Sequence, residues 1–75
     1  MKRIEIRLNT KNEAEDFVAR VSDCPVHIDL VCGHYIVDAK SIMGVLSVAV
    51  GKIVTLLVHP EDSRLLEEKV GRYIV

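Results

Sequence analysis

The sequence predicts an α+β domain in which helices cover one face of a largely antiparallel four-stranded sheet. Segments that alternate apolar and polar residues, typical of half-buried strands, are interleaved with segments whose apolar residues recur at helical spacing. The resulting order is βαββαβα, without an internal repeat or a linker. A chain of 75 residues can bury one core, so residues 1–75 are expected to form a single domain.

The first strand is expected where Ile4, Ile6 and Leu8 alternate with charged residues. Thr10 and Glu13 have the spacing of a capping box, in which each side chain accepts a hydrogen bond from the other residue's backbone N–H. A helix is expected to follow, because four apolar residues have the spacing i, i+3, i+4 and i+7: Ala14, Phe17, Val18 and Val21.

The second and third strands are expected to form a hairpin. Val26, Ile28 and Leu30 alternate with polar residues, and residues 35–37 form a short apolar segment. Gly33 lies between the two segments and can adopt the positive φ that a tight turn needs.

Ser41 is predicted to cap a short helix, because it directly precedes apolar residues at helical spacing: Ile42, Met43, Val45 and Leu46. Residues 53–58 are almost wholly apolar and predict a strand in the centre of the sheet. Residues 59–62 are expected to open a last helix whose inward face is Leu65, Leu66, Lys69, Val70 and Tyr73.

The composition excludes several classes of function. The chain is 49% hydrophobic and 28% charged with a net charge of -1, so it is neither disordered nor basic enough to indicate a nucleic-acid or membrane-surface partner. No signal peptide is predicted, and no apolar segment has membrane-spanning length. Cys24 and Cys32 are expected to be reduced thiols in the cytoplasm. The three histidines fall on different elements without a partner at ligand spacing, so no metal site or cofactor is predicted.

Residues 38–47, Asp-Ala-Lys-Ser-Ile-Met-Gly-Val-Leu-Ser, resemble the regulatory-serine segment of the histidine-containing phosphocarrier (HPr) family. The resemblance continues through Gly51 into residues 52–56. It implies the HPr-like open-faced β-sandwich, with three helices on one face of the sheet. It also implies that Ser41 is phosphorylated, because a dedicated kinase phosphorylates the corresponding serine in many Gram-positive bacteria. The resemblance further implies that Met43, Val45 and Leu46 contact protein partners.

The likeness fails where the family carries its phosphoacceptor histidine, in the motif Gly-[Leu/Ile]-His-[Ala/Thr]-Arg-Pro-Ala. Residues 8–14 read Leu-Asn-Thr-Lys-Asn-Glu-Ala, so Thr10 stands in place of the histidine and Asn12 in place of the arginine. Glu13 adds a carboxylate at the start of the helix, where it would repel a phosphoryl group. Histidine phosphotransfer is therefore not expected at this position.

Three functions remain open. The first is a non-catalytic regulatory or protein-binding module related to the sugar phosphotransferase system, with an HPr kinase/phosphorylase or a transcription regulator as partner. The second is an active phosphocarrier that uses an unusual histidine such as His59. The third is a structural module that forms a homodimer, since more apolar residues occur than one sheet face needs: Val26, Val31, Val37, Leu57 and Val58.

Overall fold

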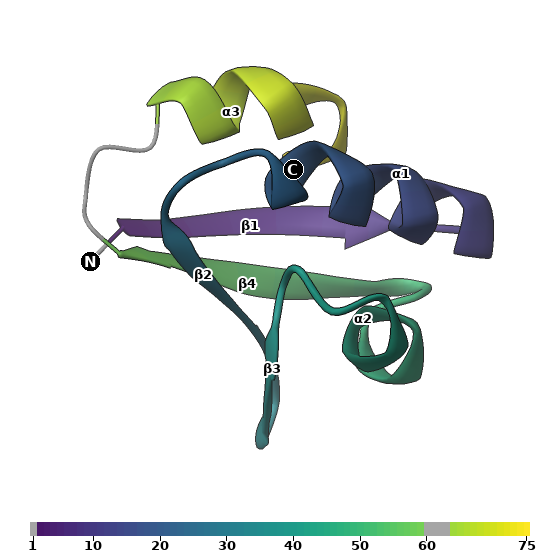
Figure 1. Cartoon of the computed structure of the whole chain (residues 1–75). Helices are drawn as coiled ribbons and strands as arrows, with labels where there is room; N and C mark the ends of the chain where they lie inside the picture. Colours follow the sequence, from purple (N-terminus) through teal and green to yellow (C-terminus); the bar gives the residue numbers. More distant parts are fainter. Residues whose placement is uncertain (1, 60–63) are drawn as a thin grey trace.

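A computed structural model describes residues 2–59 and 64–75. Figure 1 shows strands β1, β4, β2 and β3 with helices α1 and α3 above β1 and β4, and α2 beside β3. The strands are β1 (Lys2–Leu8), β2 (His27–Cys32), β3 (Tyr35–Asp38) and β4 (Lys52–His59). The helices are α1 (Lys11–Ser22), α2 (Ile42–Val48) and α3 (Arg64–Val70), followed by a 3-10 helix, η1 (Gly71–Tyr73). The predicted order βαββαβα is confirmed.

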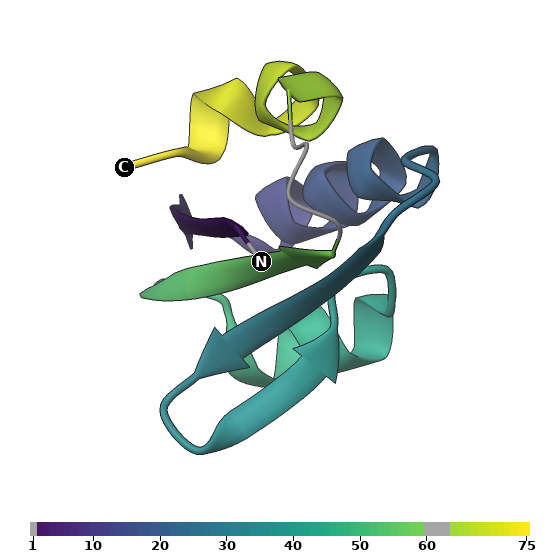
Figure 2. The same ribbon diagram turned by 90° about the vertical axis from the view of Figure 1, so that its left-hand side faces the viewer.

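The sheet has the strand order β1-β4-β2-β3, and all of its strand pairs are antiparallel. Strand β4 therefore lies in the interior of the sheet, as its apolar sequence predicted. The two-residue β2–β3 turn is possible because Gly33 adopts a φ of 60°. Figure 2 shows α1 and α3 on the same side of β1 and β4.

The core lies between the sheet and the three helices. Alternate residues of each long strand point into it, as the alternation of apolar residues predicted. The buried strand residues are Ile4, Ile6, Leu8, Ile28, Leu30, Val54, Leu56 and Val58. Phe17 of α1, Val45 of α2 and Leu66 of α3 belong to the same buried cluster, so one core holds all three helices.

None of the helices in residues 2–59 and 64–75 covers the other side of the sheet, which we call the open face. Because directly paired residues share a face, the register of the strands identifies its members. They are Arg3, Glu5, Arg7, His27, Asp29, Val31, Ile36, Asp38, Ile53, Thr55, Leu57 and His59.

Two of the five apolar residues expected in excess, Val31 and Leu57, do lie on the open face. The expectation was wrong for the others. Val58 is fully buried beneath the helices, because it is adjacent to Leu57 in a strand and must point to the opposite face. Val26 and Val37 are partly buried against the core.

The last helix also differs from its prediction. Leu66, Val70 and Tyr73 are buried, but Leu65 is 52% exposed and Lys69 is only partly buried. Leu66 points into the core, whereas Leu65, about 100° away around the helix, points toward solvent. His59 ends β4 instead of opening the helix, and residues 60–62, also expected there, lie outside the described residues.

The C-terminal segment is joined to α1 by a polar cluster. The Tyr73 hydroxyl donates a hydrogen bond to Asp16 Oδ2, and Arg20 Nε donates to the same oxygen at 2.7 Å. Arg20 Nη1 also donates to the carbonyl of Lys69 at 3.1 Å. The Tyr73 and Arg20 hydrogen bonds lower the pKa of Asp16, while burial and the Asp16 carboxylate raise the pKa of Tyr73. These groups anchor the end of the chain.

We expect Tyr73→Phe to flatten the dependence of stability on pH at both extremes. The folded pKa of Asp16 is lowered, so its contribution is complete above the unfolded pKa and is lost as pH falls through the folded value. The folded pKa of Tyr73 is raised, so its contribution is complete below about 10 and is lost as pH rises through the folded value. Urea unfolding from acid to alkaline pH measures both slopes, and identical slopes in the wild type and the variant contradict the assignment.

Candidate functional site

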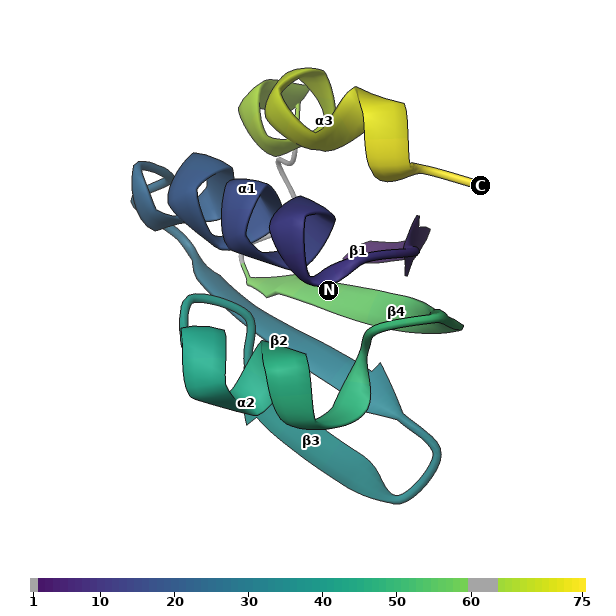
Figure 3. The ribbon, with the colours of Figure 1, turned by 90° about the vertical axis from the view of Figure 1, so that its right-hand side faces the viewer.

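The sequence-predicted site residues lie on two helix segments that face the same side of the molecule. Figure 3 shows the start of α1 above α2, with both toward the viewer, and both lie at the right of Figure 1. We call this surface, formed by residues 10–13 and 41–47, the α1–α2 face. A hydrogen bond from Gly51 N–H to the Leu8 carbonyl at 2.7 Å joins the chain after α2 to the end of β1, just before α1.

The start of α1 is capped as the sequence predicted, with one difference. Thr10 Oγ1 accepts a hydrogen bond from the Glu13 N–H at 3.1 Å. The Glu13 carboxylate, however, accepts from the N–H of Asn9 at 2.8 Å, one residue before the position that a reciprocal capping box requires. Asn12 is exposed. Residues 10–13 therefore present a hydroxyl, an ammonium, an amide and a carboxylate, but no imidazole or guanidinium.

The three histidines of the chain are all placed elsewhere. Leu8 pairs with Lys52 at the beginning of β4, whereas His59 is the last residue of that strand, so His59 lies at the opposite end of β4 from the start of α1. His27 pairs with His59. His34 lies in the β2–β3 turn, and β3 is three strand spacings, roughly 14 Å, from β1. The positive end of α1 has a carboxylate beside it and no histidine to carry a phosphoryl group.

The start of α2 is capped by a neutral side chain. Ser41 Oγ accepts a hydrogen bond from the Gly44 N–H at 3.3 Å, which confirms the predicted N-cap. Ser41 is exposed, and the first turn of α2 contains no acidic residue. Asp38 precedes the cap and accepts a hydrogen bond from the Lys40 N–H at 2.9 Å, which turns the chain from β3 toward the helix.

The residues expected to contact partners divide between surface and core. Met43 is 75% exposed and Leu46 is partly buried. Val45 is fully buried, so its assignment to a partner surface was wrong. Helix α2 packs closely on β3, where a Cβ added to Gly44 would lie 3.0 Å from the Val37 Cβ, and this packing turns Val45 into the core.

A groove beside Met43 is formed where α2 meets the β2–β3 hairpin. It is lined by Tyr35, Val37, Met43, Gly44, Ser47 and Lys52, among others. Tyr35 is 66% exposed and extends the apolar surface that Met43 begins. Sequence reasoning placed Tyr35 in a strand but missed it as a surface residue, because β3 lies at the edge of the sheet and only the tertiary fold shows that its end is uncovered.

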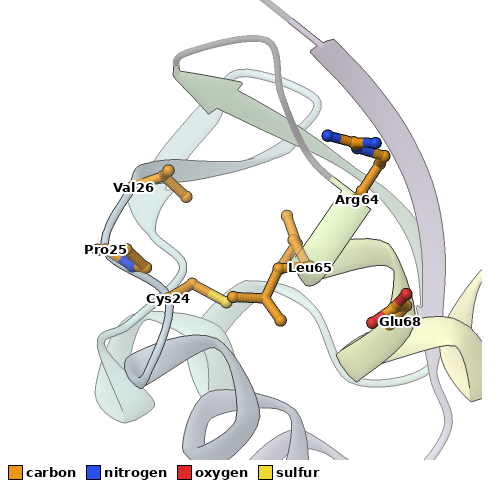
Figure 4. A pocket seen from close by; sticks show the side chains of 7 residues that line it. Cys24, Pro25, Val26, Arg64, Leu65 and Glu68 are labelled. Atoms are coloured by element: carbon orange, nitrogen blue, oxygen red, sulfur yellow. The ribbon is translucent and has the colours of Figure 1, made fainter.

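A second pocket lies between the α1–β2 connection and α3. Figure 4 shows Cys24, Val26 and Pro25 on one side and Arg64, Leu65 and Glu68 on the other. The Cys24 residue is 2% exposed, and both Cys24 and Cys32 are free thiols, as expected. Apolar side chains dominate this pocket, which is separate from the α1–α2 face.

Strand pairing brings together three polar residues that the sequence separates. His27 Nε2 lies 3.0 Å from Asp29 Oδ1, and His59 Nε2 lies 3.8 Å from Asp29 Oδ2. The two imidazole centroids are 5.6 Å apart on the open face. The histidines therefore do have an acidic partner, contrary to the sequence analysis, which lacked the register of β2 and β4. Among residues 2–59 and 64–75, no group of three or more His, Cys, Asp or Glu side chains is suited to hold a metal ion.

In the part of the chain that the structure describes, no helix has the length and apolar character needed to cross a bilayer.

Comparison of the sequence found no matching family model and no matching curated protein. The structure is similar to that of HPr-C-His from Thermoanaerobacter tengcongensis, with a TM-score of 0.78 and 28% identity over 97% of this chain and 91% of that chain. It also shares the fold of the phosphocarrier protein HPr from Bacillus anthracis, with a TM-score of 0.74 and 22% identity over 96% of this chain and 95% of that one.

The cap of α1 gives a stability prediction. Thr10→Ala removes the oxygen that accepts the Glu13 N–H and should lower the free energy of unfolding by about 1 kcal/mol. Thr10→Ser retains that oxygen and should lower the free energy of unfolding by clearly less than Thr10→Ala does. Urea unfolding of both variants tests this assignment, and equal losses would show that the hydroxyl does not stabilise the helix.

Proposed function

We propose that this chain, an HPr-like protein, is a non-catalytic regulatory module related to the sugar phosphotransferase system. In this proposal it carries no phosphate on histidine. It is phosphorylated at Ser41 and binds a protein partner through the α1–α2 face. An HPr kinase/phosphorylase and a transcription regulator are the partners that suit this role.

The observation that carries the proposal is the difference between the two helix starts. At α1, the Glu13 carboxylate lies beside the first turn, so a doubly charged phosphoryl group would meet a like charge. At α2, the exposed Ser41 hydroxyl faces a first turn without acidic residues. A phosphoryl group on Ser41 can accept hydrogen bonds from the free amides of that turn and interact favourably with its dipole.

Exposed apolar residues on and next to the α1–α2 face favour a protein as the partner. Met43 and Tyr35 are two large apolar side chains left in water on either side of the groove. Methionine adapts its shape to a partner surface, and tyrosine is enriched in interfaces. Asn12 stands where the HPr resemblance implies an arginine that helps hold a partner, so in this proposal other groups make that contact.

A second candidate function, phosphotransfer on His59, is favoured by the Asp29 carboxylate. The Asp29 carboxylate can orient the His59 ring, but it would also repel a phosphoryl group there, as Glu13 would at the start of α1. Against this function, His59 lies at the far end of β4 from the start of α1. A phosphotransfer partner would therefore have to approach a different part of the molecule from the α1–α2 face.

We expect an HPr kinase/phosphorylase with ATP to add one phosphoryl group, seen by mass spectrometry as a gain of about 80 Da. Ser41→Ala should abolish the gain. Ser47→Ala is the matched control, because Ser47 is an exposed serine of the same helix whose hydroxyl donates to the Met43 carbonyl. No gain in the wild type, or a gain that survives Ser41→Ala, contradicts the proposal.

The two candidate functions are separated by labelling with enzyme I and phosphoenolpyruvate. The proposed regulatory role predicts no label. An acid-labile label that disappears in His59→Ala but persists in His34→Ala would establish the second candidate and end the claim that the chain carries no phosphate on histidine.

A further inference from the structure

We propose that the groove between α2 and the β2–β3 hairpin, which we call the Met43 groove, is the docking site for a partner segment of defined chemistry. That segment carries an aromatic side chain next to a carboxylate. The inference names the chemistry of the partner, and it rests on the proposed function for the role that the partner has. Figure 3 shows α2 in front of β2 and β3, with the turn of the hairpin extending past the helix.

The apolar wall of the Met43 groove favours an aromatic side chain. Met43 is 75% exposed on α2, and Tyr35 is 66% exposed on β3. A methionine thioether makes favourable contacts with an aromatic ring, often at the edge of the ring. A tyrosine ring adds edge-to-face contacts with a second ring. Both exposed side chains therefore gain most from an aromatic group placed between them.

The charge of the Met43 groove favours a carboxylate. Lys52 is exposed, and it is the charged residue among the eight that line the groove. Lys2 and Lys69 lie 3.7 and 3.8 Å from carboxylate oxygens of Glu67 and Asp23, whereas no carboxylate within residues 2–59 and 64–75 forms an ion pair with Lys52. The groove thus has a cation without a counter-charge in this part of the chain. An acidic group of a partner complements it.

The strand register places the cation and the apolar wall at a useful separation. Lys52 and Val54 point to the same side of β4, which is the side that the helices cover, because alternate residues of a strand share a face. Tyr35 lies on β3, with β2 between it and β4. Two strand spacings, roughly 10 Å across the sheet, therefore separate Lys52 from Tyr35.

The dimensions of the Met43 groove suit two neighbouring side chains of a partner. Its volume of about 600 Å³ falls within the range of small-ligand sites, about 300–1,000 Å³. An aromatic side chain and a glutamate side chain on consecutive residues can reach the apolar wall and Lys52 together. A segment that contains this pair is thus the smallest unit that uses both features of the groove.

The Met43 groove also shares α2 with Ser41, which lies two residues before Met43. A partner docked in the groove therefore lies near the proposed position of phosphorylation. The groove itself does not require that modification, so the unmodified protein is used to test it. Failure of the docking test leaves phosphorylation of Ser41 standing, and failure of Ser41 phosphorylation leaves the docking result standing.

Titration of the full, isotope-labelled chain with three capped dipeptides, followed by NMR, tests the proposal. The probes are acetyl-Phe-Glu-amide, acetyl-Phe-Gln-amide and acetyl-Phe-Lys-amide. We expect saturable shifts of the Tyr35, Met43 and Ser47 amides, with dissociation constants in the millimolar range. The Glu peptide should bind about threefold more tightly than the Gln peptide, because an exposed ion pair contributes modestly, and the Lys peptide should bind most weakly.

A charge reversal tests the contribution of Lys52. Lys52→Glu should reverse the order of the three peptides, because the Lys peptide then carries the complementary charge. Lys11→Glu makes the same change in net charge at an exposed position outside the groove, and should leave the order unchanged. An order that Lys52→Glu does not alter overturns the proposal.

Truncation of the apolar wall tests the aromatic contact. Tyr35→Ala and Met43→Ala should each weaken binding of all three peptides by about threefold or more. Ile36→Ala is the matched control, because Ile36 is 64% exposed on the open face of the same strand, and it should bind as the wild type does. Circular dichroism checks that every variant is folded. The absence of saturable shifts at the groove contradicts the proposal. Shifts that depend on protein concentration without peptide would identify a second copy as the occupant and also contradict it.

Discussion

The fold depends on the position of β4 between β1 and β2. This strand is separated from both neighbours in the sequence, yet it forms the hydrogen-bonded ladders that join the β1 edge to the β2–β3 hairpin. Its alternate residues Val54, Leu56 and Val58 supply the middle of the core. Gly51, at a φ of 82°, allows the turn that sets the strand in register, with Lys52 opposite Leu8. That register also places the end of α2 near the start of α1, and so creates the α1–α2 face.

Local features of the fold were predictable because the residues that determine them are close in sequence. The alternation of Ile4, Ile6 and Leu8, and the caps Thr10 and Ser41, involve partners no more than four residues away. Sequence reasoning erred where two adjacent positions both carry apolar side chains. Leu65 and Leu66 were assigned to one face of a helix, but only Leu66 is buried and Leu65 is 52% exposed. Val45 was assigned to the surface, although the packing of Gly44 on Val37 turns it inward.

The polar groups of the open face were not predictable from the sequence alone. His27, Asp29 and His59 come together only because β2 and β4 pair with His27 opposite His59. A shift of one residue in that register would move every side chain of one strand to the opposite face. The same holds for Arg3, Leu57, Asp29 and Asp38, which pair in one row across all four strands of the open face. Candidate sites that depend on strand register require the structure, whereas those at helix caps can be found from local spacing.

The start of a helix leaves amide groups without intrahelical partners, and a protein can satisfy them in ways that have different functional consequences. In α1 the Glu13 carboxylate lies beside these amides and binds the preceding Asn9 N–H, so the negative charge that suits this end of the helix is already present. In α2 the neutral Ser41 hydroxyl caps the helix, and its charge can change without displacing a carboxylate from the first turn. Adding a phosphoryl group to Ser41 would then alter the surface beside Met43 while the helix remains capped. In the proposed regulatory role, Ser41 is the position where charge is added, on the same helix as the exposed Met43, whereas the Glu13 carboxylate already lies at the start of α1.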